Sequence, residues 1–332
     1  MQQSFLLDFK YFKENINKGP SNKVIKSSLI GVVVMSLTYK ILEKLVKLIR
    51  LKKIFLLPED TILNYARKQN QKPSFKIQNE KDLYFEDKTF LSQRLIILHS
   101  KNKKPGAILY LFGGGYITNP DKRDLTLAKK ICRMTGKDVC FYFYPLCIEN
   151  SIVKTYASTV KLYEEMTKIY DKEPLSVIGF SSGASLALGI CLYINENNLD
   201  IRMPREIIAS SAGGCLCDEL DMDRVRKLNE KDIIVDYKYF ETAKNIMTKD
   251  EVVPDYMLYP FRGNFKNFPM TYLYYGSYEV IYAFAPLFEA ALKNYGINYK
   301  LIVGEGLCHC YPLLSIFKEG KVAQEEIINI LK

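Results

Sequence analysis

Histidine, tryptophan and long apolar runs are what this chain has least of. Only two of its 332 residues are histidines, His99 and His309, so an imidazole that takes up a proton must be one of these two. Tryptophan is absent, which together with abundant Tyr, Phe, Lys and Asn reflects base composition and excludes no chemistry. The apolar run at residues 29–39 is shorter than the roughly 18–20 residues of a membrane-spanning helix. A polar stretch of 28 residues precedes that run and no small-residue cleavage site follows it, which also disfavours a secretory signal peptide.

The eight cysteines do not follow the spacing of a zinc site. Cys215 and Cys217, and likewise Cys308 and Cys310, are separated by one residue, whereas zinc ligands usually come in C-x₂₋₄-C pairs. A metal bound to His309 would also withdraw that imidazole from proton transfer. Without a secretory signal, a reducing compartment is favoured over a disulfide framework. We therefore expect a cytoplasmic protein that requires no metal and no cofactor.

Apolar strand patterns alternate with helical patterns along most of the chain. The expected strands are residues 94–98, 107–112, 138–144, 175–179, 206–210, 271–275 and 299–303, and the expected helices are 121–135, 152–170, 183–194, 281–294 and 321–331. Alternation at this spacing is typical of a mostly parallel sheet covered by helices on both faces, the α/β class. No internal repeat or low-complexity tract interrupts it.

The most informative motif is a serine between two glycines at a strand-to-helix bend. Residues 179–183 read G-x-S-x-G with Ser181 at the centre, after an apolar strand and before a run of small, helix-forming residues. Glycines on both sides allow a strained turn that exposes the hydroxyl at the N-terminus of a helix. The bare pattern also fits an ordinary turn, but the flanking strand and helix favour a nucleophilic Ser181.

Three consecutive glycines follow another apolar strand. Gly113, Gly114 and Gly115 leave backbone N–H groups unshielded by Cβ atoms, and preorganised donors of this kind stabilise the oxyanion of a tetrahedral intermediate. A phosphate-binding loop would end in Lys-Ser or Lys-Thr, which Tyr116-Ile117 does not supply. The loop therefore favours an oxyanion hole.

The two histidines occupy different contexts. His99 lies within a strand, where an ordinary sheet histidine is expected, whereas His309 lies in a loop after the last strand. A late histidine after the nucleophile and the acid matches the chain order of α/β-hydrolase triads. We therefore expect His309 to accept the Ser181 proton and return it to the leaving group.

These motifs together resemble the hormone-sensitive-lipase-like carboxylesterases, a branch of the α/β-hydrolases. The resemblance spans roughly residues 58–316 and includes, besides the glycine loop and the serine turn, residues 144–146, 254–264, 276–280 and 306–309 in the order of that family. It implies an α/β-hydrolase fold with a helical N-terminal cap. By the same resemblance Ser181 is the nucleophile and His309 the base. The N–H groups of Gly113, Gly114 and Ser182 then form the oxyanion hole, and Tyr116 contacts the substrate.

Two positions depart from the family pattern. Phe112 stands where the family usually has a histidine before the glycines, and Tyr278 stands where many relatives carry the triad Asp. The adjacent Glu279 is the only carboxylate in that turn, so we expect it to orient His309. The alternative is a surface glutamate that caps the helix beginning near Val280.

Residues 1–57 form a basic arm, and residues 58–332 form the expected catalytic domain. Residues 1–58 contain eleven Lys and Arg but three Asp and Glu, a net charge of +8 out of +10 for the whole chain. Nothing in them resembles a nucleic-acid-binding pattern, so no nucleic-acid partner is expected. Apolar residues recur at helical spacing and alternate with lysines. The apolar residues are Ile41, Leu42, Leu45, Val46, Leu48, Ile49 and Phe55. Such a basic amphipathic helix can cover the active site as a cap and can also place residues 29–55 on an anionic membrane surface, and the two roles are not exclusive.

Three functions remain open from the sequence. The first is a serine carboxylesterase acting on small or medium acyl esters through an acyl-enzyme. The second, motivated by Phe112 and Tyr278, is a catalytically impaired hydrolase that binds a ligand or partner. The third is a membrane-surface lipid deacylase that uses the basic arm for binding. Pairing through the last strand and helix would in each case give a homodimer.

Overall fold

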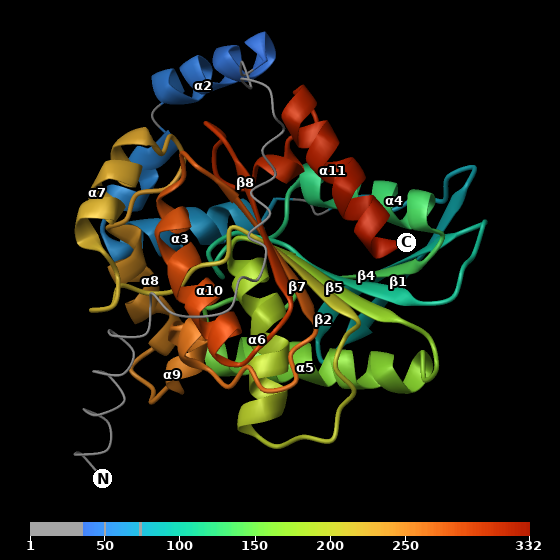
Figure 1. The fold of residues 1–332 in the computed structure, drawn as a ribbon. Coiled ribbons are helices and arrows are strands. Elements are labelled where there is room, and N and C mark those ends of the chain that lie inside the picture. Colours follow the sequence, from blue (N-terminus) through green and yellow to red (C-terminus); the bar gives the residue numbers. More distant parts are fainter. Residues whose placement is uncertain (1–35, 50, 73–74) are drawn as a thin grey trace.

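A single eight-stranded sheet forms the centre of the computed structural model, which describes residues 36–49, 51–72 and 75–332 (Figure 1). In chain order its strands are β1 (Leu83–Phe90), β2 (Gln93–Ser100), β3 (Ala107–Leu111), β4 (Asp138–Tyr142), β5 (Leu175–Phe180), β6 (Glu206–Ser210), β7 (Met270–Gly276) and β8 (Tyr299–Gly304). The spatial order is β1-β2-β4-β3-β5-β6-β7-β8. In this described part of the chain, β2 is antiparallel to β1 and β4, and the other neighbours are parallel. The expected mostly parallel sheet is confirmed.

The central strands are buried over their whole length. Every residue of β3, β4, β5 and β6 is buried, which explains why these segments are nearly continuous apolar runs. Strand β1 was not expected from the sequence. It lies at the edge of the sheet, only Leu83 in it is buried, and its sequence LYFEDKTF lacks an apolar face.

Helices cover both faces of the sheet. Helices α4 (Lys122–Thr135) and α11 (Lys318–Leu331) pack together on one face, and α5 (Ile152–Ile169) and α6 (Ser182–Glu196) pack together on the other (Figure 1). Helix α4 begins at a capping box formed by Asp121 and Asp124 and ends at Gly136, whose φ of +77° suits glycine. A 3-10 turn, η3 (Val280–Phe284), leads into α10 (Ala285–Asn294).

Several short helices were absent from the sequence expectation. They are α3 (Glu59–Asn70), α7 (Met222–Lys231), α8 (Tyr239–Thr248), α9 (Asp255–Leu258) and the 3-10 turns η2 (Pro260–Arg262) and η4 (Tyr311–Leu313). Helix α7, for example, buries only Val225 and Leu228, too few residues to produce a recognisable apolar periodicity. Helix α2 (Leu37–Ile49) and the 3-10 helix η1 (Leu51–Leu56) precede α3, and α2 lies at the top of the view in Figure 1.

Candidate active site

Ser181 sits at a sharp turn between β5 and α6. Its backbone has φ +53° and ψ −123°, a conformation that costs a non-glycine residue on the order of 1–3 kcal/mol. The glycines on either side are needed because the chain passes close to itself. A Cβ at Gly179 would lie 2.0 Å from the carbonyl oxygen of Gly183, and a Cβ at Gly183 would lie 2.2 Å from that of Phe112. The Ser181 N–H donates to the Ser210 carbonyl at 2.8 Å, which ties the turn to β6.

A continuous chain of hydrogen bonds joins three residues that are far apart in the sequence. Nε2 of His309 lies 2.9 Å from Oγ of Ser181, and Nδ1 of the same ring lies 2.6 Å from Oε2 of Glu279. Parallel strands bring the three together, because the segments that carry them all leave the sheet at the carboxyl ends of β5, β7 and β8. The structure thus places these three predicted residues in the order that serine catalysis uses.

Glu279 is fully buried, and both of its carboxylate oxygens have partners. While Oε2 faces His309, Oε1 accepts hydrogen bonds from Ser211 Oγ at 3.0 Å and from the Gly276 N–H at 2.9 Å. The side chain makes no capping hydrogen bond to the turn that begins at Val280. The alternative of a surface capping glutamate is therefore wrong. Tyr278 takes no part in this contact; its ring lies 4.9 Å from the Lys231 ammonium.

Two further polar residues lie next to Glu279, and no pattern in the sequence pointed to either. Ser211 donates to Glu279 and accepts from the Cys310 N–H at 3.1 Å, so it links the acid to the histidine loop. Asp232 is buried and accepts from the Val280 N–H at 2.7 Å, next to Glu279. Its other oxygen accepts from the N–H groups of residues 234 and 235. Neither residue belongs to a short motif, since each is recognisable only by its spatial neighbours.

Burial and neighbouring charges set the protonation of this cluster. Burial raises the pKa of the Glu279 carboxyl, hydrogen bonds from His309 and Ser211 lower it, and the charge of Asp232 raises it further. Burial also raises the pKa of Asp232, opposed by His309 and by backbone N–H donors. Burial by itself lowers the pKa of His309, but the Cys310 sulfur and the Glu279 carboxylate raise it above the ordinary value of 6.5. The imidazole therefore holds its proton to higher pH than a free histidine does.

The glycine loop lies directly against the serine. A Cβ at Gly113 would come within 3.1 Å of the Ser181 Cβ, so the loop backbone and the hydroxyl share one small space. In the described part of the chain, the N–H groups of Gly113 and Gly114 donate to no backbone carbonyl. The N–H of Ser182, in the first turn of α6, has no partner within the helix. These three donors are thus available to a ligand oxygen.

Phe112 is held by an aromatic contact where the resembled family usually has a histidine. Its ring stacks on Tyr144 with centroids 4.3 Å apart and an interplanar angle of 7°. The Tyr144 hydroxyl donates to the Phe112 carbonyl at 2.7 Å. This pair fixes the backbone immediately before the glycines, so the loop is shaped without an imidazole.

A cavity of about 590 Å³ opens next to Ser181 and His309. Its walls are mostly apolar, and the contributing residues include Tyr116, Val235, Phe240, Met247, Met257 and Leu258. The Tyr116 hydroxyl is buried and has no hydrogen-bond partner. Val46 of α2 together with Ile54 and Phe55 of η1 also line the cavity, so the N-terminal segment forms part of its wall.

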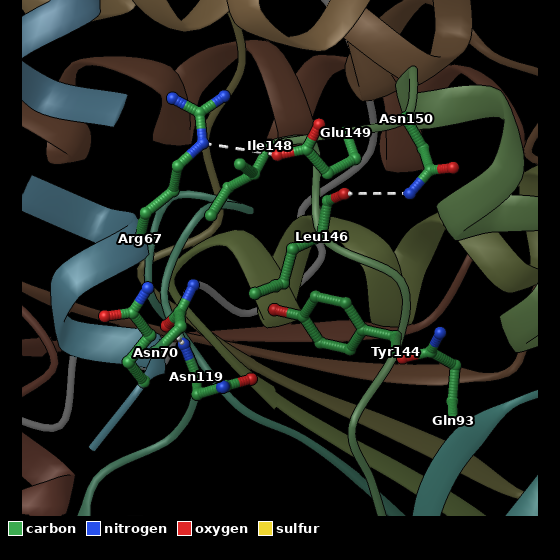
Figure 2. Close-up of a pocket in the computed structure, with 10 residues that line it drawn as sticks. Arg67, Asn70, Gln93, Asn119, Tyr144, Leu146, Ile148, Glu149 and Asn150 are labelled. Atoms are coloured by element: carbon green, nitrogen blue, oxygen red, sulfur yellow. Dashed lines mark hydrogen bonds and ion pairs between the residues drawn. The ribbon is translucent and has the colours of Figure 1, made fainter. Parts of the chain in front are cut away.

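A second pocket of about 390 Å³ lies between α3 and residues 144–150 (Figure 2). Its polar groups are paired with one another: Arg67 contacts Glu149 at 3.2 Å, and the Asn150 amide points at the Leu146 carbonyl. The Asn70 side chain accepts from the Asn119 N–H and donates to the Ile117 carbonyl, both at 2.8 Å. The hydrogen bonds of Asn70 therefore connect α3 to the segment after the glycines. Neither Ser181 nor His309 lines this pocket.

His99 and seven of the eight cysteines make no contact with Ser181, His309 or Glu279 through the hydrogen bonds described above. His99 stacks on Tyr84 and contacts Asp138 at 2.9 Å, as expected for a sheet histidine. Cys310 is the exception, because its sulfur lies 3.6 Å from Nε2 of His309. Within residues 36–49, 51–72 and 75–332, no three His, Cys, Asp or Glu side chains are grouped to hold a metal ion. Among these same residues, none of the helices combines the length and apolarity needed to cross a bilayer.

A strained serine on a strand-to-helix turn, above a mostly parallel sheet, defines an α/β hydrolase. A family model described as alpha/beta hydrolase fold matches residues 108–313, and the chain belongs to this family. The resemblance to hormone-sensitive-lipase-like proteins is thereby confirmed at the level of family and fold. No curated protein matches the chain.

Three solved structures illustrate the likeness. An esterase/lipase from an uncultured bacterium is 18% identical with a TM-score of 0.72, covering 89% of this chain and 98% of its own. An esterase from the bacterial hormone-sensitive lipase family is 17% identical with a TM-score of 0.74, covering 89% and 97%. A hormone-sensitive lipase from a metagenome library is 18% identical with a TM-score of 0.71, covering 88% and 97%. At such identities the likeness concerns the fold.

Proposed function

We propose that this protein is a serine carboxylic ester hydrolase that works through an acyl-enzyme. The observation that carries the proposal is the chain of hydrogen bonds from Ser181 through His309 to Glu279, at 2.9 and 2.6 Å. The solved structures of similar fold include proteins named as esterases, which supports the same reaction class.

The proposed reaction uses each of these groups in turn. Ser181 Oγ attacks the ester carbonyl carbon while its proton passes to Nε2 of His309. The N–H groups of Gly113, Gly114 and Ser182 donate to the oxyanion, each worth about 2.7–4 kcal/mol in the transition state. The bond to the alcohol oxygen then breaks, and His309 returns the proton to the leaving alcohol. Water, activated by the same imidazole, attacks the acyl-enzyme, which releases the carboxylic acid and restores Ser181.

The cavity supports small or medium acyl esters as substrates. Its volume of about 590 Å³ lies within the range of small-molecule sites, and its apolar walls suit an acyl chain. We propose that Tyr116, which lines the cavity, contacts the bound ester.

Fluorophosphonate labelling combined with hydrolysis of a p-nitrophenyl acyl ester tests this function. We expect stoichiometric labelling at Ser181, and Ser181→Ala should lose both labelling and turnover. Ser315→Ala, which alters an exposed serine outside the site, is the matched control and should keep both. A folded wild-type protein that neither labels nor hydrolyses would contradict the proposal and favour a ligand-binding hydrolase without activity.

A further inference from the structure

Helix α2 presents its large apolar side chains to solvent. Leu37, Ile41, Leu45 and Leu48 are 73, 50, 51 and 79% exposed. At 3.6 residues per turn, these four positions fall within about 80° of one another around the helix. They form an outward apolar stripe, which we call the α2 stripe.

The opposite side of the helix is fixed to the body of the protein. Tyr39 is 1% exposed, and its ring packs edge-on against Phe317 with centroids 5.0 Å apart. The backbone N–H and the hydroxyl of Ser36 both donate to the Glu319 carboxylate, at 2.8 and 2.9 Å. These contacts hold α2 in an orientation that keeps the α2 stripe outside.

Three exposed lysines run along one flank of the stripe. By helical position, Lys40, Lys44 and Lys47 lie together between the stripe and the packed side. The only acidic residue in α2 is Glu43, which pairs with Lys47 at 2.6 Å. An exposed apolar stripe beside a row of cations is the pattern of a helix that lies in a membrane interface.

We propose that α2 docks on an anionic lipid surface, with the α2 stripe at the acyl boundary and the three lysines against the headgroups. Charge complementarity favours this occupant over the alternatives. A second copy of the chain would bring two rows of lysines together. Residues 1–35 contain five lysines and two acidic residues, so they carry the same sign of charge as the flank.

Docking would also affect which esters reach the site. This consequence rests on the proposed function. Val46 of α2 and Ile54 and Phe55 of η1 line the cavity beside Ser181. A lipid surface held against α2 is therefore adjacent to the segment that walls the site. Esters dissolved in that surface would reach Ser181 at a higher local concentration than esters in bulk water.

Flotation of the full chain with vesicles tests the docking surface. We expect binding to vesicles of phosphatidylcholine mixed with phosphatidylserine, and little binding to phosphatidylcholine alone. Leu37→Gln with Leu48→Gln should weaken binding at least about tenfold, because these are the two most exposed side chains of the stripe. Replacing Lys40, Lys44 and Lys47 by Gln should weaken vesicle binding about fivefold per lysine. Added salt should also weaken the binding of the wild type, because it screens the attraction between the lysines and the headgroups.

Matched controls alter similar side chains on α5 and in the turn that follows it, in the lower part of the view in Figure 1. Ile169→Gln changes an apolar residue that is 72% exposed, and Lys161→Gln with Lys168→Gln and Lys172→Gln removes three charges. Both should bind as the wild type does. Equal binding of the α2 variants, or absence of wild-type binding to anionic vesicles, would overturn the proposal. Self-association that disappears in the Leu37/Leu48 variant, without lipid binding, would overturn it in favour of a second copy.

The docking and the hydrolysis can fail separately. Ser181→Ala should still float with anionic vesicles, since Ser181 lies in the site and not on the α2 stripe. The α2 variants should hydrolyse a soluble short-chain ester at the wild-type rate and lose activity only on an ester embedded in anionic vesicles.

Discussion

Glu279 holds His309 from a position one residue after the place where many relatives carry an aspartate. Its longer side chain reaches Nδ1 at 2.6 Å, and its second oxygen is fixed by Ser211 and the Gly276 N–H. A carboxylate with both oxygens engaged keeps one orientation, so it can select the imidazole tautomer that leaves Nε2 free to accept a proton. With Glu279 proposed as the acid, Tyr278 is not needed for that role.

Replacing Glu279 by Gln should lower kcat by about 10³–10⁴-fold, because an amide neither selects this tautomer nor stabilises the imidazolium. The pH profile should shift as well. His309 acts as a base only when neutral, and its pKa is raised above 6.5, so kcat/KM of the wild type should rise with pH through a midpoint above 6.5. Without the carboxylate the pKa of His309 falls, and the midpoint should move to lower pH. Steady-state kinetics across pH measure both effects, and an unshifted midpoint would contradict the contribution of the Glu279 charge to the raised pKa of His309.

At the scale of elements, the candidate site residues lie where strands lead into loops and helices, and aromatic packing positions the glycine loop. Strand β3 leads through Phe112 into the glycines, and β5 leads through Ser181 into α6. The stack of Phe112 on Tyr144 and the hydrogen bond from the Tyr144 hydroxyl fix the first of these loops. Tyr144 thus positions the backbone that precedes the glycines.

Tyr144→Phe should lower kcat about tenfold with little change in KM. The substitution keeps the ring but leaves the Phe112 carbonyl without its donor, at a cost on the order of 1–3 kcal/mol, and this loosens the loop that we propose binds the oxyanion. Tyr142→Phe is the control, because its hydroxyl contacts Ser158 and not the loop. A comparable loss of thermal stability in both variants, with kcat reduced only for Tyr144→Phe, is the expected result. Equal kcat values would mean that this hydrogen bond does not position the loop.

At the scale of the whole molecule, the N-terminal segment is part of the site. Residues 36–49 pack against the start of α11. Residues 51–56 pack against the α7–α8 region, where Lys52 donates to the Asn229 and Asp232 carbonyls. The ring of Phe55 packs on Tyr239, with centroids 4.9 Å apart. The expected cap and its boundary at residue 57 stay predictions.

Phe55→Ala should lower kcat/KM for a medium-chain ester about tenfold, and less for an acetyl ester, because the truncated side chain removes apolar wall from the cavity. Phe90→Ala is the control, since Phe90 is a half-buried residue of β1 that does not line the cavity. Hydrolysis of p-nitrophenyl esters of increasing chain length measures the effect. The same loss for every chain length would place Phe55 outside the acyl-binding part of the cavity.

The sequence by itself determined the fold class and predicted the serine, histidine and acid that the fold then brings into contact. Local chemistry sufficed there, because buried parallel strands are continuous apolar runs and the turn at Ser181 requires glycines within van der Waals distance of other backbone. The scarcity of histidine left one loop candidate for the base.

Only the tertiary structure decided the environment of these residues. Whether Glu279 is buried or caps a helix depends on Ser211, Asp232 and the His309 loop, which approach it from three other segments. Strand β1 and helix α7 were not predicted from the sequence, because contacts with neighbouring elements stabilise them and their own residues show no apolar periodicity. Contacts between distant segments leave no local pattern, and for this reason the cavity and the outward stripe of α2 became visible only in the folded chain.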